Sequence, residues 1–159
     1  MGITIKHTVG ASTVIRGSLK NSCLISVYEG LPHQMFEAEL LETECEREDV
    51  IRLHEFYFYL PKNIVNGQTA DLLCQFLSDE DSVGEFVGEK LCGGFHPDYA
   101  INWQSGNDEC LAMVCFGCGE VIYCSHDSLY RYELLGRVED KLKKLLKGFA
   151  SKRPKRLNG

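Results

Sequence analysis

The sequence predicts a single-domain α+β protein in which about three helices pack on a mostly antiparallel sheet, arranged as a meander. Apolar residues recur at helical spacing in three separate segments, and the second half contains consecutive β-rich segments joined by short turns. The chain has 159 residues, of which 44% are hydrophobic and 25% charged, as in one ordinary globular domain. We therefore assign residues 1–150 to the domain and residues 151–159 to a basic, disordered tail.

The first half predicts two short strands, a helix, an aromatic strand and a second helix. β-rich residues before residue 30 are broken by turn residues and predict the two strands. Pro32 presets the backbone for a helix start, so we expect a helix over 33–47. The aromatic segment 53–60 stops at Pro61 and predicts one buried strand or extended connector. Thr69 then caps a helix whose leucine and phenylalanine side chains share one face.

The second half predicts the meander and a third helix. The five residues 104–108 form its first turn, which places Trp103 opposite Glu109. Beyond residue 135, apolar side chains spaced by three or four positions predict an amphipathic helix. We expect the strands of the meander over 95–103, 109–116, 120–124 and 129–134.

Eight cysteines are the unusual feature of the composition. The first residues do not show the pattern of a secretion signal, which is a basic region followed by an apolar region and a small-residue cleavage site. We therefore expect a cytoplasmic location. The apolar runs are too short to cross a membrane. In a reducing cytosol, clustered cysteines more often bind metal or carry out redox chemistry, whereas isolated ones behave as small core residues. The isolated cysteines that we assign to the core are Cys23, Cys45, Cys74 and Cys110.

Charge is distributed unevenly along the chain. Residues 1–140 hold 23 acidic and nine basic residues, a net charge of −14, and the last nineteen residues hold eight basic residues and no acidic one. The acidic body favours a basic protein partner, so an inhibitor or immunity-type interaction module is one function class to consider. The short basic tail around Pro154 lacks interleaved aromatic residues, so we expect no nucleic-acid partner.

A cluster of three cysteines and one histidine is the strongest candidate for chemistry. Cys115 and Cys118 have the two-residue spacing that lets two sulfurs bind one ion, and the glycine after the second cysteine allows a tight zinc knuckle. Cys92 and His96 lie four positions apart. The strand pairing expected across the 104–108 turn brings all four residues to the same end of one hairpin. The sequence therefore predicts a structural zinc site of the Cys₃His type, which would fasten the hairpin ends.

Other interpretations of the same atoms stay open. Cys115 and Cys118 could cycle between dithiol and disulfide, as in a thiol redox or sensor protein. The three cysteines could instead be buried core thiols. A further alternative is that His96, oriented by Asp98, acts as a general base. The sequence contains no nucleotide-binding, metalloprotease or esterase motif, so we lean against enzymatic activity.

Three strings stand out when they are taken together. They are residues 27–33, the string CGGFHPDY at 92–99 and the string CFGCGE at 115–120. In this order they resemble an uncharacterised family of small bacterial proteins, over the chain from Tyr28 to the last predicted helix. The function of that family is unknown, so the resemblance implies no activity. It does single out the cysteine and histidine positions of the predicted cluster.

Overall fold

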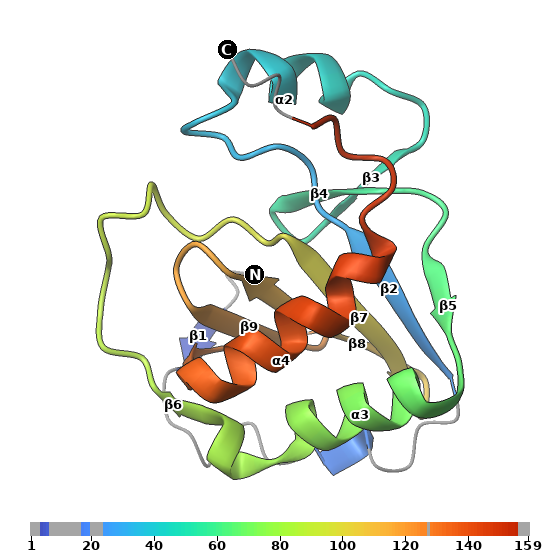
Figure 1. Cartoon of the computed structure of the whole chain (residues 1–159), viewed down its shortest axis with the longest axis vertical. Coiled ribbons are helices and arrows are strands. Elements are labelled where there is room, and N and C mark those ends of the chain that lie inside the picture. Colours follow the sequence, from blue (N-terminus) through green and yellow to red (C-terminus); the bar gives the residue numbers. More distant parts are fainter. Residues whose placement is uncertain (1–3, 7–16, 20–23, 127, 156–159) are drawn as a thin grey trace.

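The computed structural model describes residues 4–6, 17–19, 24–126 and 128–155 (Figure 1). Its main sheet has eight strands in the order β1-β10-β9-β8-β7-β2-β5, and β6 pairs with β10 on the edge that β1 also uses. All pairs are antiparallel except β1 with β10. The strands are β1 (Thr4–Lys6), β2 (Ile25–Glu29), β5 (Asn63–Val65), β6 (Val83–Glu85), β7 (Tyr99–Ser105), β8 (Asp108–Cys115), β9 (Glu120–Cys124) and β10 (Ser128–Leu134).

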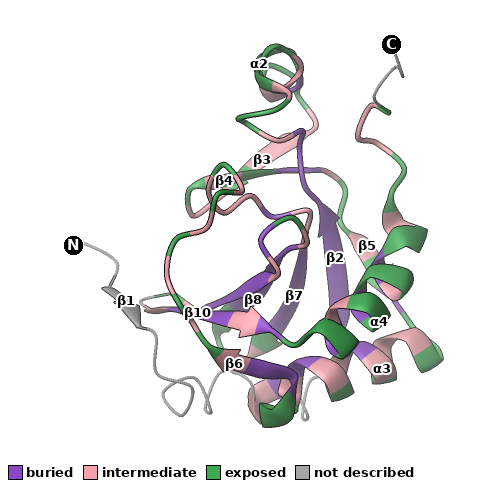
Figure 2. Ribbon diagram, turned by 60° about the vertical axis from the view of Figure 1, so that its left-hand side comes forward, coloured by how far each residue is buried: buried purple, intermediate pink, exposed green. Residues whose placement is uncertain are grey.

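Two helices cover one face of this sheet. These are α3 (Gly67–Ser78) and α4 (Gly136–Leu146), which lie side by side and turn their polar sides to solvent (Figures 1 and 2). Burying these aliphatic side chains against the strands supplies the main hydrophobic stabilisation of the fold. The helical residues buried in this core are Leu73, Leu77, Val138, Leu142 and Leu146.

A small hairpin covers the opposite face. It consists of β3 (Val50–Leu53) and β4 (Phe56–Tyr59), and its aromatic and aliphatic side chains form a second core with Phe95. Helix α2 (Ala38–Cys45) leads into this hairpin. Because the central strands are covered on both faces, β9 and β2 are buried at every position, as Figure 2 shows for β2.

The α+β class and the mostly antiparallel sheet are confirmed, with differences in detail. Within the segment 53–60, β4 forms the expected strand, but Leu53 belongs to β3, because the chain reverses at His54, which has a φ of +55°. The helix expected over 33–47 is shorter, since a turn precedes Ala38. Within the described residues, the structure has no helix that is both long and apolar enough to cross a membrane.

The β7–β8 hairpin differs from its prediction by one residue in register. The turn is tight, with Ser105 opposite Asp108, so Trp103 pairs with Cys110 rather than with Glu109. Gly106, whose φ is +62°, permits this reversal. The shift is small enough that the ends of the hairpin still meet as predicted.

Candidate functional site

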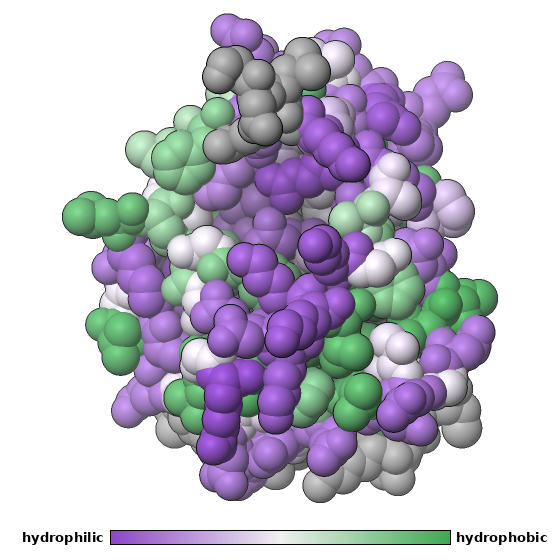
Figure 3. Space-filling model, in the orientation of Figure 1, coloured by the Kyte–Doolittle hydropathy of each residue, from purple (hydrophilic) through white to green (hydrophobic). Residues whose placement is uncertain are grey.

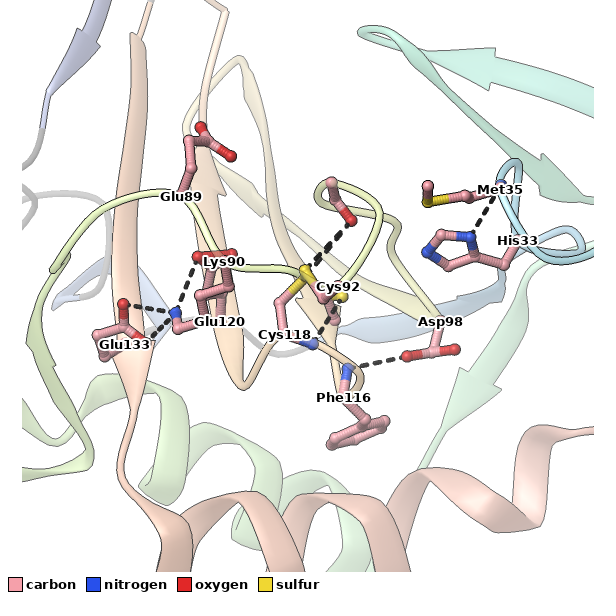
Figure 4. The surroundings of a disulfide bond; sticks show 12 residues. His33, Met35, Glu89, Lys90, Cys92, Asp98, Phe116, Cys118, Glu120 and Glu133 are labelled. Atoms are coloured by element: carbon pink, nitrogen blue, oxygen red, sulfur yellow. Dashed lines mark hydrogen bonds and ion pairs between the residues drawn. A yellow bond between two sulfur atoms is a disulfide. The ribbon is translucent and has the colours of Figure 1, made fainter.

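A disulfide joins two turns at one end of the β7–β8 hairpin (Figure 4). Cys92 lies in the connector between β6 and β7, and Cys118 lies in the turn between β8 and β9. The two Cα atoms are 5.8 Å apart, and the bond closes a sequence separation of 26 residues. The redox hypothesis paired Cys118 with Cys115, whereas the structure pairs Cys118 with Cys92.

Two consecutive glycines shape the turn that carries Cys92. Gly93 and Gly94 have φ values of +82° and +90°, a region that residues with a side chain rarely adopt. A Cβ atom on Gly93 would also lie 2.6 Å from Met35 Sδ. The carbonyl oxygen of Gly94 lies 3.4 Å from Cys118 Sγ. The glycines therefore let the backbone of this turn pack directly against the disulfide.

Cys115 places a third sulfur beside the disulfide and is a free thiol. It ends β8, is 2% exposed, and its Sγ accepts a hydrogen bond of 3.3 Å from the backbone N–H of Cys118. Burial raises the pKa of the Cys115 thiol, although hydrogen bonds from the backbone of His96 and Cys118 oppose that shift. The protonated thiol therefore predominates at neutral pH.

His96 borders the sulfurs, and its ring is held by a backbone carbonyl. Its Nε2 lies 2.6 Å from the oxygen of Leu31, and because a carbonyl oxygen can only accept, the proton resides on Nε2. Burial lowers the pKa of His96 and so favours the neutral imidazole. The ring also packs on His33, with centroids 4.8 Å apart.

The structure brings the predicted zinc ligands into one neighbourhood without forming a coordination shell. Two of the sulfurs, Cys92 and Cys118, are bonded to each other, and His96 directs Nε2 to a carbonyl oxygen. Among the residues that the structure describes, no group of three His, Cys, Asp or Glu side chains is arranged to hold a metal ion.

A cavity of about 410 Å³ opens beside the disulfide, and we call it the disulfide cavity. Cys92 and Cys115 belong to its wall, whereas Cys118 is buried and is not part of the lining. A molecule that enters this cavity therefore meets the Cys92 end of the disulfide. The remaining wall residues are His33, Phe36, Glu37, Leu91, His96, Asp98, Gly117 and Arg153.

Asp98 connects this wall to the C-terminal segment. Its carboxylate accepts hydrogen bonds from the backbone N–H of Phe116 at 2.8 Å and from the guanidinium of Arg153 at 3.1 Å. Arg153 also bonds to Glu37 at 3.0 Å, so it bridges two carboxylates. Asp98 is thus engaged by these partners, and the pairing with His96 that a general base would use is replaced by the Leu31 carbonyl.

The segment predicted as a disordered tail is bonded to the domain over its first residues. Glu29, which is 3% exposed, accepts backbone N–H bonds from Ser151, Lys152 and Arg153 at 3.1, 2.8 and 3.0 Å. Residues 156–159 lie outside the described part of the chain. Sequence reasoning missed Glu29 and Arg153 because contacts across more than 120 residues leave no local pattern. The one available hint was an acidic residue at the end of an apolar strand.

An ion-pair network anchors the connector that carries Cys92 (Figure 4). Lys90 Nζ lies 3.1 Å from Glu120 Oε1 and 2.6 Å from Glu133 Oε2. Arg131 adds a second cation 2.9 Å from Glu120 Oε2. Because the side chain of Glu120 is fully buried, these two cations replace the solvation that water would give its charge.

No protein-family model, curated protein or solved structure matches this chain. The resemblance of its three strings to a family of small bacterial proteins therefore stays a prediction, as do the cytoplasmic location and the basic protein partner. The function has to be inferred from the geometry of the site.

Proposed function

We propose that the protein carries out thiol–disulfide exchange, with Cys92–Cys118 as the reactive disulfide. The observation that supports this most is the unequal accessibility of the two cysteines. Cys92 is half-buried and lines an open cavity, whereas Cys118 is buried and does not line it. Exchange requires access of a thiolate to one sulfur, while the other sulfur departs with the electron pair. The arrangement selects Cys92 as the sulfur attacked and Cys118 as the one released.

The reaction consists of two exchanges that deliver two electrons to the protein. An incoming thiolate attacks Cys92 Sγ and forms a mixed disulfide, while the bond between Cys92 and Cys118 breaks with its electron pair on Cys118. Cys118 takes a proton from water, and its thiol can then donate to the carbonyl oxygen of Gly94, 3.4 Å away. A second external thiolate displaces Cys92, so that the two external thiols leave as one oxidised disulfide.

Cys115 offers an internal exchange beside this route. Attack of its thiolate on Cys118 would form a Cys115–Cys118 bond and release Cys92 as a thiolate, with no net change in oxidation state. Because burial raises the pKa of Cys115, the thiolate that this step needs is scarce at neutral pH. We therefore assign the main route to external thiols and the internal step to alkaline conditions.

A redox titration of the full chain, read out by thiol alkylation and peptide mapping, tests the proposal. Dithiothreitol buffers should produce a two-electron transition in which only Cys92 and Cys118 change their labelling. The variant Cys118→Ser should abolish the transition. The matched variant Cys74→Ser, on α3, should keep it. Permanent labelling of Cys92 and Cys118 at every potential, or a transition at another pair, would overturn the proposal.

A zinc site is the second candidate function, and one contact favours it. The hydrogen bond from the N–H of Cys118 to Cys115 Sγ is of the kind that stabilises a metal-bound thiolate. Zinc would need Cys92 and Cys118 reduced, and His96 would have to release Leu31 or bind through Nδ1. Elemental analysis of the reduced protein after zinc addition and desalting decides this. Retention of about one zinc, with three thiols protected until a chelator is added, would favour the metal.

A further inference from the structure

We propose that the thiol that reduces this disulfide is an anionic low-molecular-weight thiol, whose carboxylate or phosphate groups bind in a second, basic cavity next to the disulfide cavity. The inference rests on the proposed exchange reaction and names its substrate class. The second cavity, which we call the basic cavity, measures about 660 Å³ and lies between α4, the β8–β9 turn and residues 150–155. Cavities of this size suit a small molecule.

Basic side chains dominate the charge of this cavity. Its two acidic residues are already bonded, since Glu29 accepts three backbone N–H groups and Asp98 accepts one backbone N–H and the Arg153 guanidinium. Within the part of the chain that the structure describes, the lysines of the cavity form no ion pair of 4.0 Å or less. The basic residues that line it are Lys143, Lys147, Arg153 and Lys155.

Lys143 has two electrostatic interactions with neighbouring side chains. Its ammonium lies 5.9 Å from the centroid of the Phe116 ring, and it attracts Glu139, one helical turn away and outside the cavity wall. Phe116 is uncharged and Glu139 does not line the cavity, so neither contact places a negative charge beside Lys143 inside it. The lysines therefore present positive charge to whatever enters it.

The positive cavity contrasts with the charge of the whole protein. The chain carries a net charge of −6, so a diffusing anion is repelled on average and a diffusing cation is attracted. Figure 3 shows hydrophilic side chains gathered over α4, the helix that contains Lys143 and ends just before Lys147. A faster reaction with anionic thiols than with neutral ones would therefore be due to the basic cavity and not to the net charge of the protein.

The two cavities share a wall, which makes one ligand able to occupy both. Asp98, Gly117 and Arg153 line the disulfide cavity and the basic cavity alike. Apart from its two chain neighbours, no residue has a heavy atom within 4 Å of the position that a Cβ on Gly117 would take, so there is open space beside this shared residue. A thiol with its anionic end among the lysines can therefore extend over Gly117 toward Cys92.

Reduction rates with thiols of different charge test the inference. The oxidised protein is mixed with cysteamine, 2-mercaptoethanol, glutathione or phosphopantetheine, and each rate constant is corrected to the thiolate concentration. We expect glutathione or phosphopantetheine to react roughly tenfold or more faster than 2-mercaptoethanol. Glutathione carries carboxylates and phosphopantetheine a phosphate, so these two arms identify the preferred anion. Cysteamine should gain nothing.

Two charge-matched double variants separate the cavity from general electrostatics. Lys143→Gln with Lys147→Gln should remove most of the anionic advantage and leave the rate with 2-mercaptoethanol unchanged. Lys141→Gln with Lys144→Gln removes the same charge from α4 outside the cavity lining and should preserve the advantage.

The outcomes distinguish the two proposals. If 2-mercaptoethanol reduces the disulfide but anionic thiols are slower, or both double variants act alike, the substrate class is wrong and the exchange reaction stands. If no thiol reduces Cys92–Cys118 in the folded protein, the exchange reaction itself is wrong.

Discussion

Lys90 and Glu120 form an ion pair of 3.1 Å that runs beside the disulfide. Lys90 lies two residues before Cys92, and Glu120 lies two residues after Cys118, so a covalent and an ionic cross-link join the same two segments (Figure 4). Reduction removes only the covalent link. The connector should therefore keep its position in the reduced protein. The two cysteines then stay close together, and the disulfide can re-form without a large conformational change.

The variant Glu120→Gln should be strongly destabilised. The substitution keeps the shape of the side chain but removes the buried carboxylate that Lys90 and Arg131 share, and leaves Lys90 with Glu133 and Arg131 with the exposed Glu89. Breaking a buried pair in this way costs about 3–5 kcal/mol of unfolding free energy, which urea denaturation measures. As a control, Glu89→Gln removes an exposed partner of Arg131 and should cost less than about 1 kcal/mol. Equal losses in the two variants would contradict the assigned role of burial.

The variant Cys92→Ser should lower the unfolding free energy of the oxidised protein by about 3 kcal/mol, because the disulfide restricts the unfolded chain. Under reducing conditions the wild-type protein has lost the same constraint. Denaturation curves of the reduced wild type and of Cys92→Ser should therefore coincide. A large difference that persists after reduction would show that the cysteine acts through packing instead.

The variant Gly30→Ala should disrupt the wall of the disulfide cavity. The backbone N–H of Gly30 donates to the carbonyl oxygen of Asp98 at 2.8 Å, and a Cβ atom at this position would overlap the carbonyl of Pro97. We expect a loss of about 1–3 kcal/mol, measured by thermal or urea unfolding. Gly148→Ala is the matched control, because no atom lies within 4 Å of its added Cβ. It should be neutral.

Stability should fall at mildly acidic pH through His54. Burial lowers the pKa of His54 from its ordinary value of 6.5. Just below pH 6.5, His54 is therefore protonated in the unfolded chain but still neutral in the folded protein. The stabilisation is therefore complete above about pH 6.5 and declines as the pH drops toward the folded pKa. His54→Asn removes this titration and suits the positive φ of +55°.

Urea denaturation at pH 7.5 and 5.5 checks this. The Asn variant should lose less stability between the two values than the wild type does. Glu55→Gln should retain the wild-type difference, because burial lowers the pKa of His54 and the charge of Glu55 only opposes that shift. An unchanged pH difference in His54→Asn would refute the assignment.

Much of the fold follows from local patterns, and the failures have local reasons. The strand over Glu120–Cys124 agrees with its prediction to the residue, because Gly119 and the β-rich run mark its start. The sequence predicts the strand β4 but not its partner β3, since His54 and Glu55 are ordinary residues at a reversal that usually uses glycine or asparagine.

The site was predictable only as far as strand pairing reaches. Pairing across one hairpin was enough to gather Cys92, Cys115 and Cys118, even though the register was off by one. It could not show which two sulfurs bond, because that depends on the conformation of the Gly93–Gly94 turn. The hydrogen bonds that Glu29 accepts from the C-terminal segment connect distant parts of the chain, and no periodic pattern in the sequence predicts them.

The bonds between Glu29 and the C-terminal segment also constrain when the site can exist. Arg153 lines both cavities and Lys155 lines the basic cavity, whereas the cysteines of the disulfide cavity come from much earlier parts of the chain. During synthesis, the sheet and the cysteine turns emerge from the ribosome before these residues do. A nascent chain can therefore begin to fold with its cysteines in place, but it acquires the anion-binding wall only after translation has passed residue 155.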